Sequence, residues 1–291
     1  MNAPPKNLPI TYRGKTFRLF MTSRGPLHAK NHELRTLRFI PERFHKYITV
    51  VTGEEHRVCL AKKYPNLPPM WSTPSIIDSA AKKRSLVMSS YEEDYCILMN
   101  DNMSIHCHDS ETGKFLVPTP ELFRLHLRSF LDLCLSDEGF GGVALHAKAF
   151  SKQVLDSSLQ KSALPEAYSK RINFIGGFFC IKKRITANSR FHLGRLDYYE
   201  DIDYSLQLLS LGFNTVKYLG MVFENPKAGF KTPHSDRTLA IRDRDRDLLI
   251  SFFPEYARKR PPEKLRDDLN IDIYVKYTKA YQNAKTKRAI V

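Results

Sequence analysis

Two stretches of the chain combine acidic and amide side chains at a spacing that could support chemistry. The first is Asn100-Asp101-Asn102, which directly follows the apolar residues 95–99. A short apolar run predicts a buried strand, and in open α/β sheets ligands bind outside the carboxyl ends of the strands. These three side chains could therefore face a metal or a sugar, although asparagine and aspartate also form ordinary turns.

The second stretch is residues 197–204, in which four acids lie among tyrosines. Glu200, Asp201 and Asp203 lie at the predicted start of an amphipathic helix that Gly212 ends. The helix macrodipole favours acids at this place, so their presence requires no function. A partly desolvated carboxylate there could also accept the proton of a hydroxyl group, which makes the three acids candidate catalytic bases.

Basic and small residues near the first strands could hold a phosphate or a nucleoside. Thr22-Ser23-Arg24 ends the first expected strand and offers backbone donors and a guanidinium, although a simple loop is equally consistent. Lys83 and Arg84 lie on an expected helix just before the central strand. Successive cations on a helix often form only a solvated face.

Alternating strand and helix patterns position these residues. Alternation of this kind predicts an α/β fold whose central, mostly parallel sheet is flanked by helices. The proline-rich residues 65–74, which hold the only tryptophan, are expected to form a loop. In the first hundred residues the expected strands are 17–21, 47–51 and 95–99, and the expected helices are 28–40, 54–64 and 75–90.

The second half of the chain continues with strands and helices. Residues 171–181 predict a strand pair that Gly176-Gly177 interrupts, and glycines there allow a ligand to approach the backbone or simply make a bulge. Further expected strands are 103–106, 139–145 and 214–222, and further expected helices are 120–135, 200–211 and 237–253.

The charge of the chain indicates a polyanionic partner. Lys and Arg number 46 against 31 acids, which gives a formal net charge of +15. Nucleic acid is the first candidate, an anionic membrane surface is the second, and a merely well-solvated surface is the alternative. Five scattered cysteines and the lack of an N-terminal apolar segment predict a protein of the reducing cytoplasm, and no apolar run reaches the roughly 18 residues of a spanning helix.

We expect one catalytic domain over residues 1–250 and a basic helical extension over residues 251–291. The extension contains Arg258-Lys259-Arg260 and further cations toward its end. It could act as a DNA-binding arm or form a solvated, fraying end.

Taken in order, these pieces resemble a glycosyltransferase of the GT-A fold over roughly residues 15–250. Within that fold the chain resembles the phage group found beside TET-type DNA oxygenases, which glycosylates hydroxymethylated pyrimidines in DNA. The resemblance rests on the order of Lys83-Arg84, Asn100-Asp101-Asn102, Gly176-Gly177, Glu200-Asp201 with Gly212, and His234.

This resemblance implies a hexose donor such as UDP-glucose, a Mn²⁺ or Mg²⁺ ion on its diphosphate, and 5-hydroxymethylcytosine or 5-hydroxymethyluracil in double-stranded DNA as acceptor. It implies that Glu200, Asp201 or Asp203 acts as the base. It places the metal on Asp101, Asn102 and His234. The residues that would hold the nucleotide are Thr22, Ser23, Arg24, Lys83, Arg84, Asn100, Asp101, Gly176 and Gly177.

One motif departs from the family pattern, which has a run of aspartates where this chain has asparagine on both sides of Asp101. Hard cations prefer carboxylate oxygens, so we expect weaker metal binding, or neutralisation of the diphosphate by Lys83 and Arg84. Two alternatives stay open: a transferase that acts on a glycan or small molecule, and a catalytically silent DNA-binding relative.

Overall fold

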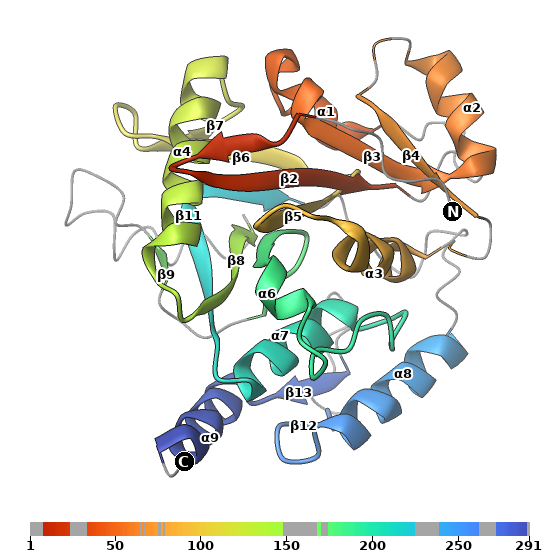
Figure 1. The fold of residues 1–291 in the computed structure, drawn as a ribbon, viewed down its shortest axis with the longest axis vertical. Helices are drawn as coiled ribbons and strands as arrows, with labels where there is room; N and C mark the ends of the chain where they lie inside the picture. The colour runs from red at the N-terminus through yellow and green to blue at the C-terminus, as the bar shows by residue number, and fades with distance from the viewer. Residues whose placement is uncertain are drawn as a thin grey trace.

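The computed structural model describes residues 8–23, 34–64, 66, 68–74, 77, 79–147, 168–169, 174–224, 239–261 and 272–289. Most strands in this part of the chain join one sheet of 11 strands, and helices cover both of its faces (Figure 1). The strands of this sheet are β1 (Ile10–Tyr12), β2 (Lys15–Thr22), β3 (Ile48–Gly53), β4 (Met70–Thr73), β5 (Tyr95–Asn100), β6 (Ser104–Asp109), β7 (Lys114–Leu116), β8 (Phe140–Ala147), β9 (Tyr168–Ser169), β10 (Phe178–Lys182) and β11 (Asn214–Glu224).

The strand order along the sheet is β4-β3-β2-β5-β10-β8-β11-β6-β7, with β1 paired to β2 and β9 paired to β11. The strands β4, β3, β2 and β5 are parallel, and β11 is parallel to β8. Thr22 of β2 lies opposite Asn100 of β5, so these two parallel strands end side by side. The expected α/β fold class is confirmed.

One strand runs against its neighbours in the middle of the sheet. β10 is antiparallel to both β5 and β8, and Phe178 at its start lies opposite Met99 near the end of β5. The amide of Asn100 also donates to the carbonyl oxygen of Gly177 at 3.0 Å. This reversal brings the two glycines before β10 to the end of the central strand.

Two hydrophobic cores lie on the two faces of the sheet, and the central strand contributes to both. Tyr95, Ile97 and Met99 point into one core, whereas Cys96 and Leu98 point into the other. Because successive side chains of a strand alternate between faces, a strand that is buried on both sides has no polar alternation. This explains the uninterrupted apolar run that precedes Asn100.

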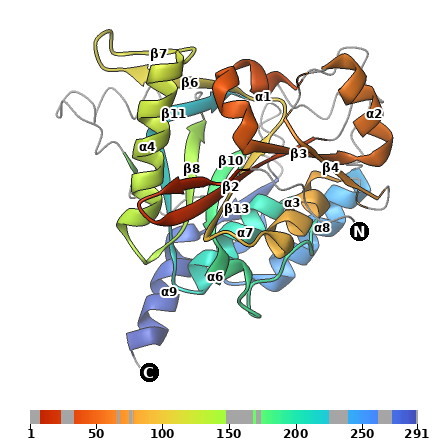
Figure 2. The same ribbon diagram turned by 45° about the horizontal axis from the view of Figure 1, so that its top comes forward.

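The helices occupy three places around the sheet (Figures 1 and 2). α4 packs on the first core, and α3 and α7 pack on the second. α8 and α9 lie beyond α7, together with a separate antiparallel pair of strands, β12 (Ala257–Lys259) and β13 (Ile273–Val275). The helices are α1 (Arg35–Arg38), the 3₁₀ helix η1 (Glu42–Tyr47), α2 (Glu54–Lys63), α3 (Ala80–Ser90), α4 (Pro120–Ser136), α6 (Lys183–Thr186), α7 (Glu200–Ser210), α8 (Leu239–Phe252) and α9 (Tyr277–Ala289).

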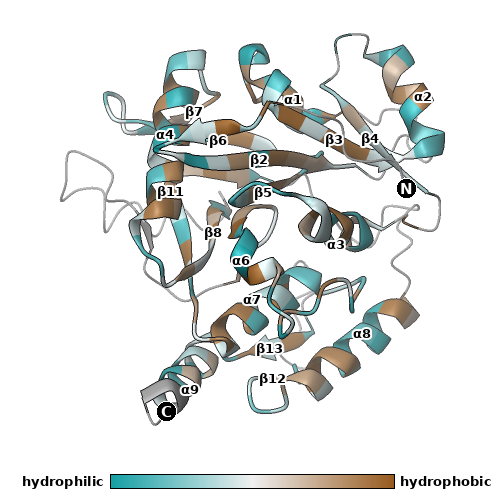
Figure 3. Ribbon diagram, viewed as in Figure 1, coloured by the Kyte–Doolittle hydropathy of each residue, from teal (hydrophilic) through white to brown (hydrophobic). Residues whose placement is uncertain are grey.

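Hydrophilic residues recur along the long helices α4, α8 and α9 (Figure 3). α4 begins where Thr119 Oγ1 accepts the amide of Leu122, and its buried stripe includes Phe123, Leu127 and Phe130. Among the residues that the structure describes, no helix is long and apolar enough to cross a membrane.

Some local expectations differ from the structure. The loop expected at residues 65–74 contains β4, which pairs with β3 and buries Trp71 against Phe20 at 6.3 Å between ring centroids. α3 begins only after Ser79, because the Ser79 hydroxyl caps the helix by accepting the amide of Lys82. Of the expected strand pair at residues 171–181, the part that the structure describes forms only β10.

The C-terminal region also differs from the expected helical extension. A division at residue 250 would cut α8, and the strands β12 and β13 lie between α8 and α9. One buried cluster joins this region to α7, and its members include Leu206, Leu249 and Ile273. The region therefore packs against the helix that carries the candidate bases.

Candidate active site

The first part of the site lies at the ends of β2 and β5. The amide of Ser23, directly after β2, donates to the carbonyl oxygen of Val51 at 2.8 Å, and Lys83 Nζ donates to the carbonyl oxygen of Ser23 at 2.8 Å. Thr22 and Ser23 are both buried. The end of the first strand is thus held between β3 and α3.

Lys83 and Arg84 are buried and point inward from α3, so these two cations do not form a solvated face. Arg84 Nη1 donates to Glu200 Oε1 at 2.7 Å, and Arg84 Nη2 donates to Asn100 Oδ1. One guanidinium therefore bridges the turn after the central strand and the start of α7. The N–H groups of a guanidinium lie in a fixed plane and can bond to two acceptors at once, a geometry that the point charge of a lysine does not offer.

The turn Asn100-Asp101-Asn102 is closed by a residue that the sequence did not indicate. Thr36 Oγ1 donates to the carbonyl oxygen of Asn100 at 2.6 Å and accepts the amide of Met103 at 2.9 Å. The amide of Thr36 donates to the carbonyl oxygen of Asp101 at 3.0 Å. These bonds fix the backbone of the turn, while Asp101 is largely buried and Asn102 is half-buried.

The two glycines lie between this turn and the start of α7. A Cβ atom on Gly176 would lie 2.6 Å from Asp201 Oδ2, and one on Gly177 would lie 2.8 Å from the ring of Phe223. Gly177 also has a φ of +71°, which side chains other than glycine rarely adopt. Both glycines therefore admit close neighbours, and at Gly176 one of the two nearest side chains, Asp201 beside Phe174, is a candidate base.

The three candidate bases have different surroundings. Glu200 is buried on Arg84. Asp203 is buried between Arg195, whose Nε lies 3.0 Å from both carboxylate oxygens, and Gln207 Nε2 at 2.8 Å. Burial raises the pKa of Asp203, although Arg195 opposes this. Asp201 is only half-buried, so it is the most exposed of the three acids.

A buried lysine lies near the same acid, and the sequence patterns did not indicate it as part of the site. Lys217 lies on β11 with its Nζ 4.8 Å from the centre of the Phe174 ring. Burial lowers the pKa of Lys217 to about 8, while the nearby Asp201 carboxylate opposes this. A lysine between Val216 and Tyr218, at the start of the mostly apolar run 216–223, is the signal that could have indicated it.

The structure brings five of the predicted segments together, namely residues 22–23, 83–84, 100–102, 176–177 and 200–203. Arg24 and His234 lie outside the described residues. In the described part of the chain, no three His, Cys, Asp or Glu side chains form a group that could hold a metal. Mg²⁺ is often held by only one or two protein carboxylates, with substrate phosphates as further ligands. The carboxylate of Asp101 and the amide oxygen of Asn102 fit such a site.

The mostly parallel sheet with β10 reversed beside the central strand agrees with the expected GT-A fold, which a solved glycosyltransferase structure similar to this chain confirms. The chain superposes on the mannosyltransferase PcManGT from Pyrobaculum calidifontis in complex with GDP-Man and Mn²⁺ with a TM-score of 0.51 and 13% identity, over 98% of this chain and 77% of that one. At this identity the likeness concerns the fold.

Two further solved structures are similar at lower scores. A mycobacterial protein matches with a TM-score of 0.48 and 10% identity over 90% of this chain and 84% of that one. Glucosyl-3-phosphoglycerate synthase from Mycobacterium tuberculosis, in complex with Mn²⁺, UDP and glucosyl-3-phosphoglycerate, matches with a TM-score of 0.45 and 11% identity. The match covers 82% of this chain and 80% of that one. No protein-family model matches the chain, and no curated protein matches it.

Proposed function

We propose that the chain is a nucleotide-sugar-dependent glycosyltransferase that moves a hexose to a hydroxymethylated pyrimidine in DNA. The observation that carries the proposal is the convergence of the ends of β2 and β5, the glycines before β10 and the start of α7. Arg84 joins two of these parts by its bonds to Asn100 and Glu200. A donor and an acceptor hydroxyl need such a meeting point, because transfer requires both to be held in reacting geometry.

The donor would bind at the ends of β2 and β5. In this proposal Thr22, Ser23 and the turn after β5 contact the nucleotide, and Asp101 with Asn102 holds a Mn²⁺ or Mg²⁺ ion. When bound, the ion neutralises the charge of the diphosphate. The similar mannosyltransferase structure contains GDP-Man and Mn²⁺, which supports a nucleotide sugar of this class. Both UDP-hexoses and GDP-hexoses are therefore candidate donors.

Asp201 would act as the base if the reaction inverts the anomeric carbon. The hydroxyl oxygen of the acceptor bonds to that carbon, the carbon–phosphate oxygen bond breaks, and the nucleoside diphosphate leaves with the bonding electrons. The hydroxyl proton would pass to Asp201, which is half-buried and so the most accessible of the three acids. Glu200 and Asp203 would position the helix start, since both are buried on arginines.

The net charge of +15 supports DNA as the acceptor. Lysine and arginine contacts to phosphates supply affinity without reading sequence, and a 5-hydroxymethyl group projects into the major groove. A glycan or small-molecule acceptor would make this charge incidental.

The test incubates the protein with UDP- and GDP-hexoses and with duplex DNA that contains 5-hydroxymethylcytosine or 5-hydroxymethyluracil, with and without Mn²⁺. The digested nucleosides are weighed by mass spectrometry, and unmodified DNA is the control. We expect a hexose-sized gain on one hydroxymethylated nucleoside only.

Release of nucleoside diphosphate without a gain on DNA would contradict the DNA acceptor and favour another acceptor. No release with any donor, together with salt-sensitive DNA binding, would contradict the transferase and favour a silent DNA-binding protein.

A further inference from the structure

A buried carboxylate of α8 holds the loop that leads into α7. Asp245 Oδ2 accepts the amides of Asp197 and Tyr198 at 2.8 and 2.7 Å, and its side chain is fully buried. Arg244 Nε donates to the other oxygen, Oδ1, at 2.8 Å. The loop backbone is therefore bonded to a residue that lies 48 and 47 positions away in sequence.

The residue between this loop and the helix has an unusual backbone. Tyr199 has φ 61° and ψ 16°, the left-handed region that is unfavourable for residues with a Cβ. Its carbonyl oxygen accepts the amide of Asp203 at 2.9 Å, which is the first hydrogen bond of α7. The conformation of Tyr199 thus sets the direction in which Glu200 and Asp201 leave the helix start.

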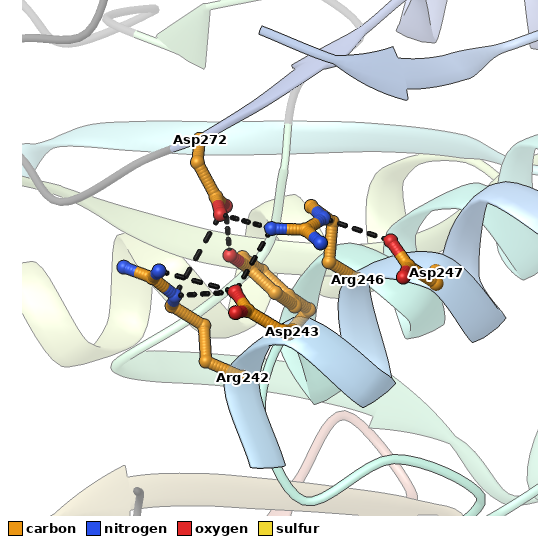
Figure 4. Close-up of polar contacts among 6 residues, drawn as sticks. Arg242, Asp243, Arg246, Asp247 and Asp272 are labelled. Atoms are coloured by element: carbon orange, nitrogen blue, oxygen red, sulfur yellow. Dashed lines mark hydrogen bonds and ion pairs between the residues drawn. The ribbon is translucent and has the colours of Figure 1, made fainter. Parts of the chain in front are cut away.

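A second buried carboxylate holds the side chain of Tyr199. The hydroxyl of Tyr199 donates to Asp272. The Asp272 carboxylate also accepts from Arg246 Nη1 at 2.9 Å and lies 3.6 Å from Arg242 Nε. Figure 4 shows Arg242 and Arg246 around Asp272, with Asp243 between the two arginines and Asp247 beyond Arg246. A residue in a sparsely populated conformation persists only where its surroundings impose it. Here Asp245 of α8 and Asp272 provide those surroundings.

We infer that Asp245 and Asp272 are positioning residues for the acids of α7. The inference rests on the proposed function, because it assigns the C-terminal region the task of holding Asp201 at its reacting place. It differs from the expectation of a DNA-binding arm or a fraying end. The contacts of this region point to α7, and a buried cluster that includes Leu206, Leu249 and Ile273 joins the two.

The test compares Asp245→Asn and Tyr199→Phe with Asp132→Asn, a matched change of a carboxylate on α4 that lies outside this network and whose side chain is 40% exposed. Hydrogen exchange is followed at the amides of Asp197, Tyr198 and Asp203, and kcat and the donor KM are measured alongside. For the two test variants we expect exchange about tenfold faster or more. We also expect kcat to fall about tenfold while the donor KM changes less than about twofold. The control should match the wild type in both.

Unchanged exchange, or faster exchange with an unchanged kcat, would overturn the inference, since the carboxylates would then act on stability alone. A drop in kcat for Asp132→Asn equal to that for Asp245→Asn would overturn it as well. A wild-type protein that transfers no sugar to any acceptor would overturn the proposed function and the catalytic part of the inference together. Unchanged exchange in an active enzyme would overturn the inference alone.

Discussion

Arg84 on α3 and Glu200 at the start of α7 form an ion pair of 2.7 Å across 116 positions of sequence, and their side chains are only 4% and 5% exposed. The same guanidinium donates to Asn100 at the end of β5. A buried pair of this kind is weak evidence for stability, but its loss is costly because the remaining charge stays buried. The pair therefore fixes the geometry of the site more than it stabilises the fold.

Breaking this pair from one side should destabilise the protein strongly. Glu200→Leu or Arg84→Met should each lower the free energy of unfolding by about 3–5 kcal/mol, and the double variant should recover much of the loss. Urea denaturation measures all three. Glu121→Leu, which breaks the exposed pair with Arg43, is the control and should cost less than about 1 kcal/mol. Single variants that behave like this control would contradict the prediction.

Asp201→Asn should remove the base while leaving the fold intact. We expect kcat to fall about a hundredfold to ten-thousandfold with little change in the donor KM, because a carboxamide cannot accept the hydroxyl proton. Steady-state kinetics and thermal unfolding measure the two effects. Asp132→Asn on α4, where the carboxylate bonds to Tyr12 beside the start of β2, is the matched control and should stay active. An active Asp201→Asn variant would assign the base to another group.

Gly176→Ala should act on activity through its contact with Asp201. The added Cβ would lie 2.6 Å from both Asp201 Oδ2 and Phe174 Cε2, so the carboxylate and the ring must both shift, and we expect kcat to fall about tenfold or more. Gly113→Ala is the control, since Gly113 has φ +67° but no neighbour within 4 Å of the new atom. It should cost about 1 kcal/mol of stability and leave kcat unchanged. Equal kcat values for the two variants would contradict a close approach at Gly176.

Lys217→Met should remove the increase in the free energy of unfolding that the wild type shows as the pH rises from about 8 to 10.5. The pKa of Lys217 is lowered to about 8 from 10.5, a difference worth about 3 kcal/mol. The unfolded chain holds the Lys217 proton more tightly than the folded chain does, so burying the charged lysine lowers the free energy of unfolding. This destabilisation is complete below pH 8 and is lost as the pH rises from about 8 to 10.5. At pH 7 the variant should gain up to about 3 kcal/mol, and near pH 10 the gain should largely vanish.

Urea denaturation of wild type and variant at the two pH values measures this gain. Lys114→Met, at an exposed position of β7, is the control and should show no such dependence. A gain from Lys217→Met that is the same at both pH values would show that packing, rather than charge, is responsible.

Asn102→Asp should strengthen metal binding at the turn after β5. A second carboxylate beside Asp101 gives a hard cation another preferred ligand, and we expect Mn²⁺ to bind about tenfold more tightly in the presence of UDP or GDP. Titration calorimetry measures the affinity, and chelation of the metal should reverse it. Asn188→Asp, outside the site, is the control for added charge. Equal Mn²⁺ affinities for Asn102→Asp and wild type would argue that the diphosphate is neutralised by cations of the chain.

The sequence by itself determined the local elements and the order of the site segments. The apolar run of β5 and the turn after it were predictable because a strand buried on both faces carries no polar residue. The helix α7 was predictable from its acidic start and from Gly212, whose φ of +78° ends it as expected. The candidate acids and glycines were found because their types are unusual beside apolar strands.

Only the tertiary structure decided which of these residues meet and what each one faces. The sequence left Lys83 and Arg84 as a possible solvated face, and the structure buries both. It also reverses β10, places Lys217 near Asp201, and bonds Asp245 and Asp272 to the residues before α7. Whether a charge is buried depends on partners that arrive from distant segments, and no local pattern encodes that meeting.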